Sequence, residues 1–327
     1  MEFVSETTVV APAGVAASTT AAFRHDLLAA LAQEPRRISP KYFYDAAGSA
    51  LFDRICDLPE YYPTRTEIAL IERHAGDIAK LSGAHAEIIE FGAGSLHKIR
   101  LLLDALDRPK RFVPIDISAE HLTTAAVALM RDYDHLAVQP VAADYTQPFD
   151  LPAALPGTGR RIGFFPGSTI GNFTAEESVA FLRAAASMLR GGALLLGADL
   201  VKEPALLHAA YNDAQGVTAA FNLNLLARAN RELDADFVLE QFAHSAFYNA
   251  PLQRIEMHLM SRAAQAVQVG GCTFDFVQGQ TLHTENSQKF TIDGLRKLAS
   301  HAGFTPGPVW TDAAQNFSLH WLWAPSD

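Results

Sequence analysis

The sequence predicts an α/β fold in which a parallel sheet is covered by helices on both faces and closed by an antiparallel hairpin. Two observations carry this prediction. Short, continuous apolar runs alternate with helix-length segments over residues 63–198, which is typical of buried parallel strands joined by crossover helices. After Asp199, helical patterns and then alternating strand patterns follow one another, which predicts a smaller α+β subdomain before the chain returns to the first sheet.

We expect this organisation to divide the chain into four segments. Residues 1–62 form an N-terminal segment that contributes to a substrate domain, and residues 63–198 form a cofactor domain. Residues 199–286 form a substrate-binding subdomain. Residues 287–327 return to the cofactor domain and supply the closing hairpin.

Local patterns assign the elements in chain order. Apolar residues at helical spacing predict helices near residues 20–32, 68–81, 99–106, 119–133, 174–190, 204–212, 217–233 and 292–302. Apolar or alternating runs predict strands near residues 88–91, 112–117, 137–144, 162–165, 193–198, 247–248, 254–260, 308–311 and 317–323. Gly270-Gly271, between VQV and CTFDF, predicts a two-residue hairpin turn.

Two helix starts match a capping box, in which a threonine side chain and a glutamate side chain each accept a hydrogen bond from the other's backbone N–H. The pairs are Thr64 with Glu67 and Thr174 with Glu177. We therefore expect one helix to begin at each threonine.

A strand, Ile88 to Phe91, runs into a glycine-rich turn, Gly92-Ala93-Gly94, and a helix follows. This arrangement puts free backbone N–H groups and a helix N-terminus at one point, where a nucleotide-like cofactor can sit. Glycine has no Cβ, so the backbone can turn sharply and approach a ligand closely. An ordinary strand-to-helix turn has the same pattern, and these residues alone leave that alternative open.

Acidic residues near the turn and at the ends of later strands strengthen the cofactor interpretation. Asp116 ends the second strand, roughly 20 residues beyond the glycines, where a carboxylate can hold a ribose diol. His97 replaces the third glycine of a dinucleotide site, and Asp144 ends the third strand, where it can accept from an adenine amino group. Together with Glu90 just before the turn, these residues favour S-adenosylmethionine over NAD.

Composition argues against several classes of function. The net charge of −10 argues against nucleic-acid binding. The chain has no run of ~18 apolar residues, so we expect no membrane span. The N-terminus lacks the basic region of a signal peptide, and the two distant cysteines, Cys56 and Cys272, suit a reduced cytoplasmic protein. The twelve histidines show no zinc-site spacing, so we expect no metal, and we expect a monomer.

Two further stretches could line a binding site. Residues 40–67 are unusually aromatic, and buried tyrosines need partners for their hydroxyls, so this segment reads equally as a pocket wall or as core. The stretch PGSTIGNFT follows the fourth strand and offers Ser168, Thr169 and Asn172 at the sheet edge where open α/β sheets hold ligands.

Six motifs occur in combination over nearly all of the chain after about residue 20. They are YFYDAAGSALFDRICDLPEYYPTRTE (42–67), EFGAGSLHK (90–98), FFPGSTIGN (164–172), AAYNDAQGVTAAFN (209–222), IEM (255–257) and HTENSQKF (283–290). Together they resemble the S-adenosylmethionine-dependent histidine Nα-methyltransferases of ergothioneine biosynthesis. The glycine turn is shared by many methyltransferases, whereas the tyrosine-rich segment, GSTIGN and TENSQKF are specific. The resemblance implies a Rossmann-like class I methyltransferase sheet.

The resemblance implies an enzyme that transfers three methyl groups from S-adenosylmethionine to the α-amine of L-histidine, giving hercynine, in the first step of ergothioneine biosynthesis. Lys98 would face the methionine carboxylate of the cofactor, Asp116 its ribose and Asp144 its adenine. The full set of implied cofactor contacts is Gly92, Lys98, Asp116, Asp144, Tyr145 and Ser168. The family often has other residues at Ala93 and Ser95, which the turn tolerates.

The resemblance also assigns the substrate contacts. Tyr44 would face the α-amine as the catalytic residue, and Asn172 and Tyr211 would hold the carboxylate. The imidazole end would consist of Tyr61, Met257, Glu285 and Ser287. A buried carboxylate beside an imidazole accepts a hydrogen bond from the imidazole N–H, so we predict that Glu285 selects histidine. Taken alone, Glu285 would more often be a salt-bridged surface residue.

Three alternatives remain at this stage. The same fold could methylate another amino acid amine, such as that of tryptophan, but Met257 and Glu285 argue against it. A catalytically inactive cofactor-binding regulatory module would not need Tyr44, Asn172 and Tyr211. A dehydrogenase is disfavoured by the missing third glycine.

Overall fold

The computed structural model describes residues 14–94 and 96–326, so the first thirteen residues of the predicted N-terminal segment and Ser95 of the glycine turn lie outside the described residues. The strands of the larger sheet are β2 (Glu87–Phe91), β3 (Arg111–Asp116), β4 (Ala137–Val138), β5 (Val141–Ala142), β6 (Arg161–Phe165), β7 (Ala193–Asp199), β13 (Thr305–Thr311) and β14 (Phe317–Trp323). Their order is β13-β14-β7-β6-β2-β3-β4, and β5 also pairs with β3.

The pairing directions of this sheet match the prediction. Strand β2 lies parallel to β3 and β6, and β6 lies parallel to β7. Strand β14 runs antiparallel to β7 and to β13, so these last two strands form a closing hairpin. The predicted fold class is therefore confirmed.

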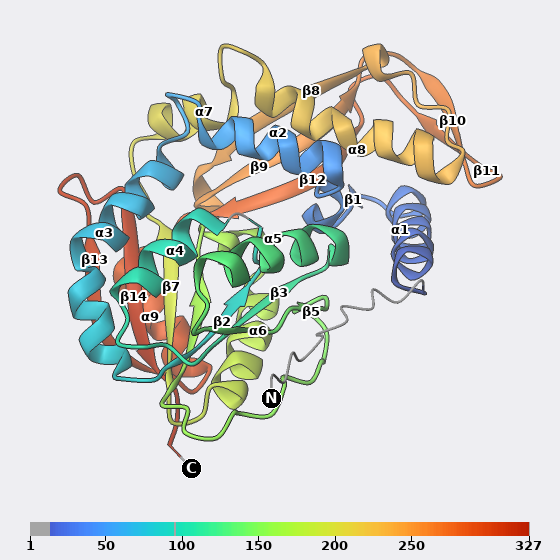
Figure 1. Ribbon diagram of the computed structural model, residues 1–327. Coiled ribbons are helices and arrows are strands. Elements are labelled where there is room, and N and C mark those ends of the chain that lie inside the picture. Colours follow the sequence, from blue (N-terminus) through green and yellow to red (C-terminus); the bar gives the residue numbers. More distant parts are fainter. Residues whose placement is uncertain (1–13, 95, 327) are drawn as a thin grey trace.

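Helices cover both faces of the larger sheet (Figure 1). The helices on one face are α3 (Tyr62–Ser82), α4 (Leu96–Ala105) and α5 (Ala119–Asp132), and those on the other are α6 (Ala175–Met188) and α9 (Ile292–His301). Successive strand residues point to opposite faces, so Ile88 packs in the cluster with α3 and α4, and Ile89 packs with α6 and α9. Burying one such side chain stabilises the fold by about 1.5–3 kcal/mol.

A second, smaller sheet forms the other part of the molecule. Its strands are β1 (Arg36–Arg37), β8 (Phe242–Asn249), β9 (Arg254–Ser261) and β12 (Thr281–Gln288), in the order β1-β12-β9-β8. The accompanying helices are α1 (Gly14–Ala32), α2 (Ala46–Cys56), α7 (Pro204–Tyr211) and α8 (Val217–Leu233). In Figure 1, α2 and α8 lie across one face of this sheet. Phenylalanine side chains of α1 and α8 belong to one apolar cluster with this sheet, and the phenylalanine of α2 packs against it.

The predicted hairpin at Gly270-Gly271 is confirmed between β10 (Gln265–Val269) and β11 (Cys272–Phe276). Both glycines have positive φ, +57° and +86°, as a two-residue turn of this type requires. Four short 3-10 helices complete the described elements: η1 (Pro40–Phe43), η2 (Thr169–Asn172), η3 (Leu239–Gln241) and η4 (Ala250–Leu252).

Two local predictions are wrong. The run 137–144 does not form one strand, because Pro140 has no N–H to donate and separates β4 from β5. The capping box at Thr64 and Glu67 does not form either, since α3 begins at Tyr62 with Pro63 in its first turn. The other capping box is confirmed, and Glu177 N–H donates to Thr174 Oγ1 at 3.2 Å.

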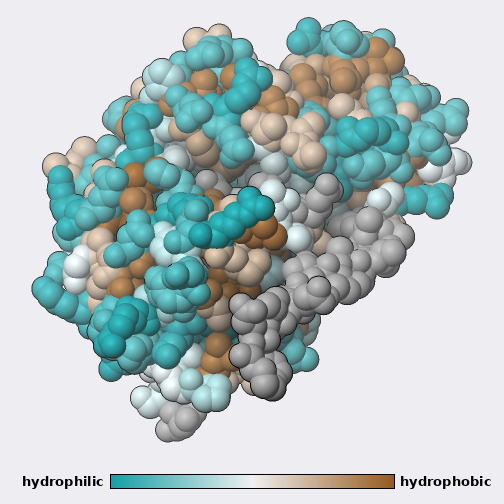
Figure 2. All heavy atoms as spheres, in the orientation of Figure 1, coloured by the Kyte–Doolittle hydropathy of each residue, from teal (hydrophilic) through white to brown (hydrophobic). Residues whose placement is uncertain are grey.

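Figure 2 shows hydrophilic residues over most of this face of the molecule, with hydrophobic residues in separate groups between them. Among the helices that the structure describes, none has the length and apolar character needed to cross a membrane.

Candidate functional site

The glycine-rich turn follows β2 near the middle of the larger sheet. Gly92 has φ +78°, a left-handed conformation that glycine adopts without strain. A Cβ placed on Gly92 would lie 3.5 Å from the hydroxyl of Tyr145, so these two predicted cofactor contacts face each other.

The backbone of this turn is less open than the sequence suggests. The N–H groups of Gly92 and Ala93 both donate to the Ile115 carbonyl, at 2.9 and 3.0 Å, and Gly94 N–H donates to Gly92 O. The expectation that these N–H groups are free for a ligand is therefore wrong. The bonds instead tie the turn to β3.

Lys98, in the first turn of α4, forms a buried ion pair that the sequence reading missed. Its Nζ donates to Glu67 Oε2 at 2.6 Å. The N–H of Gly167 donates to both oxygens of Glu67, at 3.0 and 2.9 Å. Glu67 is fully buried in α3. Its carboxylate therefore joins α3, α4 and the turn after β6 at the sheet edge.

Glu90 adds a second buried carboxyl group beside Lys98. It is 1% exposed, and its Oε2 has no hydrogen-bond partner among the described residues. Burial raises the pKa of Glu90 well above its ordinary value, and this effect outweighs the nearby positive charge of Lys98. Glu67 is the carboxylate that pairs directly with Lys98.

Asp116 and Asp144 follow the carboxyl ends of neighbouring strands, as predicted. Asp116 Oδ1 accepts the Ser118 N–H at 2.9 Å. Asp144 accepts from Lys41 Nζ at 3.1 Å and from Thr146 N–H at 2.9 Å. Burial disfavours the charge of Asp144, but hydrogen bonds from Thr146 and Lys41 outweigh burial and lower its pKa. Because Lys41 lies in η1, this pair joins the N-terminal segment to the carboxyl edge of the larger sheet.

Ser168 and Asn172 lie at the two ends of the turn after β6. Ser168 has φ +56° and ψ +25°, a conformation that costs a non-glycine residue of order 1–3 kcal/mol and is found preferentially at functional sites. Its Oγ accepts the Asp199 N–H at 2.9 Å. Asn172 ends η2 and is partly exposed. A Cβ on Gly171 would lie 2.9 Å from the Gln288 carbonyl, so the glycine lets η2 approach β12 closely.

The aromatic segment supplies a connected wall of rings. Tyr44 meets Phe52 and Phe221 edge-on, with ring centroids 5.6 and 5.8 Å apart. Phe52 contacts Tyr61 at 6.3 Å, and Tyr61 contacts Tyr211 at 6.4 Å. The core interpretation applies to some residues of this segment, and for the others the pocket interpretation stays a prediction.

The hydrogen bonds of the tyrosine hydroxyls distinguish the core tyrosines from those that could face a ligand. Tyr42 and Tyr62 are buried and donate to Asp26 and Asp199. No described residue hydrogen-bonds the hydroxyls of Tyr44 and Tyr61, which are only partly buried. Burial first, and then the charge of Glu285, raises the pKa of the Tyr44 hydroxyl well above its ordinary value. Tyr44 is therefore a neutral phenol whose hydroxyl is available to a ligand.

Met257 and Glu285 lie directly opposite each other on β9 and β12. Among the residues described, none hydrogen-bonds the carboxylate of Glu285. Burial raises the pKa of Glu285 to about 7, although the positive charge of Lys289 lowers it in part. The alternative of a salt-bridged surface glutamate is therefore wrong.

Tyr211 and Ser287 belong to a buried polar network. Tyr211 O–H donates to Ser287 Oγ at 2.7 Å, and Lys289 Nζ donates to the same oxygen at 2.8 Å. Lys289 also pairs with Asp199 at 2.8 Å, and Lys202 pairs with the same carboxylate. This network connects the end of β7 in the larger sheet to β12 in the smaller one.

Tyr44 lies close enough to Tyr145 of the predicted cofactor set and to Glu285 of the predicted substrate set for both side chains to affect its pKa. Three residues were missed by sequence reasoning: Glu67, Asp199 and Lys289. Two of them lay inside the specific motifs, Glu67 at the end of the tyrosine-rich segment and Lys289 in TENSQKF. Their positions inside these motifs were the sequence signal that could have identified Glu67 and Lys289.

A family model described as "Histidine-specific methyltransferase, SAM-dependent" matches residues 23–324. The chain belongs to this family. The cofactor is therefore S-adenosylmethionine, as predicted, and the dehydrogenase alternative is wrong.

Relatives of this methyltransferase cover almost its whole length. The chain is 42% identical to the histidine N-alpha-methyltransferase of Mycolicibacterium smegmatis, over 92% of this chain and 95% of the relative. It is also 42% identical to the same-named protein of Mycobacterium tuberculosis, over 91% and 94%. A solved S-adenosylmethionine-dependent methyltransferase from Clostridium acetobutylicum has the same fold, with a TM-score of 0.50 at 9% identity, covering 84% of this chain and 98% of that one.

The residues at the sheet edge fit the family's cofactor chemically. Asp116 and Asp144 offer carboxylate acceptors for a diol and an amino group, and Lys98 offers a cation for a carboxylate. Gly92 leaves the space in front of Tyr145 without a side chain.

Proposed function

We propose that this methyltransferase transfers three methyl groups from S-adenosylmethionine to the α-amine of L-histidine and forms hercynine, the first step of ergothioneine biosynthesis. The observation that carries the proposal is the state of the Glu285 carboxylate. Burial raises its pKa, and no described residue hydrogen-bonds it. Such a group needs a ligand that donates an N–H, and imidazole is the amino acid side chain that fits beside Met257.

We propose that Glu285 and Ser287 bind the two imidazole nitrogens, with Met257 and Tyr61 packing against the ring. Glu285 would accept one N–H. Ser287 Oγ already accepts from Tyr211 and Lys289, so its own proton is available to donate to the other nitrogen. An indole offers only one ring N–H and no acceptor, so it would leave this donor without a partner.

We propose that Asn172 and Tyr211 bind the substrate carboxylate, with the Tyr211 hydroxyl turning its proton from Ser287 Oγ to the carboxylate while Lys289 continues to donate to Ser287. Lys289 supports this role, because its buried ammonium lies 3.4 Å from the Tyr211 hydroxyl and contributes a positive field there. The carboxylate and the imidazole would then fix both ends of the substrate and leave its α-amine to face Tyr44.

When bound, S-adenosylmethionine supplies an activated methyl group on a sulfonium. The protein's part is position, which can contribute on the order of 7–11 kcal/mol. Gly92, Lys98, Asp116, Asp144, Tyr145 and Ser168 would hold the cofactor. Tyr44, as a neutral phenol, would accept a hydrogen bond from the neutral amine and orient its lone pair, and water would take the released protons.

The aromatic wall supports repeated methylation. Each transfer makes the amine larger, and the third leaves it permanently cationic. The rings of Tyr44, Phe52 and Phe221 can stabilise such a cation through cation–π attraction of about 0.5–2 kcal/mol.

We propose that residues 1–62 and 199–286 hold the substrate and that residues 63–198 and 287–327 hold the cofactor. Two connections support this division: β1 pairs with β12, and β14 pairs with β7. We further propose that the enzyme acts as a monomer in the cytoplasm, on a small molecule and without a nucleic-acid or membrane partner.

Mass spectrometry of L-histidine incubated with the purified protein and S-adenosylmethionine tests the proposal. We expect a product that gains three methyl groups. No gain, with cofactor binding intact by calorimetry, would reject histidine as the substrate and leave the fold assignment standing. Methylation of tryptophan in a parallel reaction would favour the alternative amino acid.

A further inference from the structure

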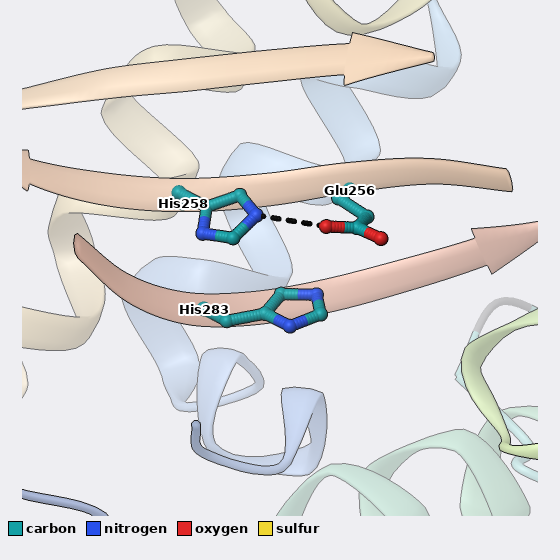
Figure 3. A group of neighbouring side chains, drawn as sticks. All are labelled: Glu256, His258 and His283. Carbon is teal, nitrogen blue, oxygen red and sulfur yellow. Dashed lines mark hydrogen bonds and ion pairs between the residues drawn. The ribbon is translucent and has the colours of Figure 1, made fainter. Parts of the chain in front are cut away.

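Three potential metal ligands converge on the reverse face of the smaller sheet. Glu256 and His258 are alternate residues of β9, so both side chains point to the same face. His283 lies directly opposite His258 on β12. Met257 and Glu285, the opposed pair of the proposed imidazole site, point to the other face. In Figure 3 the three side chains lie on one side of the strands, with helices behind them.

The spacing of these side chains suits a shared ion. One ligand atom of each residue lies within 4.8 Å of the other two, and His258 Nε2 lies 3.2 Å from Glu256 Oε2. Zinc bonds of about 2.0–2.1 Å place neighbouring tetrahedral ligands roughly 3.3 Å apart. The Glu256–His258 pair already has that spacing, and a ligand atom of His283 lies within 4.8 Å of both. The two imidazoles stack with centroids 4.5 Å apart, which keeps both rings on this face.

Neighbouring groups orient the ligands. Arg254 and Asn249 donate to Glu256 Oε1 at 2.8 and 3.0 Å, which leaves Oε2 directed at the histidines. His258 Nδ1 lies 3.3 Å from Thr281 Oγ1, a hydroxyl that can accept a hydrogen bond from Nδ1–H once Nε2 binds a metal. Such outer contacts are typical of metal sites. The charge of Arg254 lowers the affinity for a cation but does not block Oε2.

The donor types favour ligation, since imidazole nitrogens and carboxylate oxygens both bind divalent metals of the zinc class. The His258 side chain is 13% exposed, which leaves a route from solvent.

A separate observation points to the same place. Asn286 lies directly opposite Glu256 on β12 and is 2% exposed. Neither its amide nitrogen nor its amide oxygen has a hydrogen-bond partner among the described residues. A buried polar group without a partner costs about 1–3 kcal/mol, so a bound ion or its water on this face would satisfy it.

We propose that Glu256, His258 and His283 bind one divalent transition-metal ion of the zinc class, with imidazole nitrogen and carboxylate oxygen ligands. The site is separate from the methylation site and does not depend on the proposed function. The sequence does not reveal this site through a short histidine spacing. Its ligands come from two neighbouring strands and meet only when β9 and β12 pair.

The test is titration of the tag-free, full-length protein with Co²⁺ and with Zn²⁺, followed by visible absorption and calorimetry. Every variant carries Cys272→Ser, because this exposed thiol could bind metal. We expect one ion per chain, and we expect Glu256→Gln and His258→Asn each to weaken binding by at least about tenfold. His208→Asn, at an exposed position of α7, is the matched control and should bind as the parent does.

Unchanged affinity in both Glu256→Gln and His258→Asn would overturn the proposal, as would a parent protein that binds no ion. Cofactor binding and the far-ultraviolet circular dichroism of each variant show whether it is folded. If His258→Asn misfolds, the isosteric Glu256→Gln decides alone.

Discussion

The proposed cofactor side and the proposed substrate side of the site differ in whether their polar groups have partners within the protein. On the proposed cofactor side, Lys98 pairs with Glu67 and Asp144 pairs with Lys41, although Glu90 Oε2 has no partner among the described residues. On the substrate side, the carboxylate of Glu285 and the hydroxyl of Tyr44 have no hydrogen-bond partner within the described residues. The cofactor edge is thus assembled by contacts between protein elements, whereas the substrate side leaves polar groups that a ligand must complete.

This contrast predicts that the largest loss of substrate binding follows removal of the unpaired carboxylate. Glu285→Ala should lower kcat/KM for L-histidine by about tenfold to a hundredfold, because a charged hydrogen bond contributes about 1.5–3 kcal/mol. The cofactor Kd should stay the same. Steady-state kinetics and calorimetry measure the two quantities, with the exposed Glu240→Ala as the control. Intact histidine affinity in Glu285→Ala would remove the residue from the site.

The pH dependence sharpens the same point. Burial raises the pKa of Glu285 to about 7, so below that pH the group is protonated and no longer accepts an imidazole N–H. The KM for histidine should therefore rise as pH falls, by roughly tenfold from pH 8 to pH 6 if the carboxylate form alone binds. Glu285→Gln has no titrating group at this position. Subtracting its profile removes the titration of the substrate, and identical profiles for the two proteins would contradict the assignment.

On the cofactor side, the pair between Lys98 and Glu67 can be broken without changing shape. Glu67→Gln keeps an oxygen for the Gly167 N–H but loses the charge that positions Lys98. We expect cofactor affinity to fall by about tenfold while the KM for histidine at saturating cofactor is unchanged. Calorimetric titration with S-adenosylmethionine gives the affinity. Tighter binding would mean that Glu67 competes with the cofactor instead of positioning Lys98.

The smallest effect is expected at the α-amine. Tyr44→Phe keeps the ring and its contacts with Phe52 and Phe221 but removes the hydroxyl. Loss of one neutral hydrogen bond of about 0.5–1.5 kcal/mol should lower kcat by roughly twofold to tenfold, with little change in KM. Rapid-quench measurement of the first methyl transfer checks the step itself. A loss confined to KM would make Tyr44 a binding residue only.

The sequence was sufficient for features that depend on local pattern. The structure contains the predicted apolar strands, Gly92 at the turn, Asp116 and Asp144 at the strand ends, and the closing hairpin. Each of these can be predicted from the spacing of apolar residues or from turn chemistry. Tyr42 and Tyr44 show the limit of this approach. They are two residues apart and chemically identical, and only the packing of α1 and α8 decides that one hydroxyl is buried against Asp26 and the other is not.

The remaining residues were missed for a related reason. Glu67 fits a local capping pattern, but its actual partners are Lys98 and Gly167, from distant parts of the chain. Lys289 is an ordinary lysine in sequence, and its pairing with Asp199 exists only once the two sheets meet. Charge pairs across elements leave no periodic signal, so only the family resemblance or the structure can assign them.

The most direct test of the account is a competition experiment in one tube. The protein, limiting S-adenosylmethionine and equal amounts of L-histidine and L-tryptophan are incubated, and mass spectrometry follows the methylated products over time. The account predicts methyl groups on histidine alone, rising to three per molecule, and a large loss of that product in Glu285→Ala. Methylated tryptophan in equal or greater amount, or selectivity that survives Glu285→Ala, would contradict it.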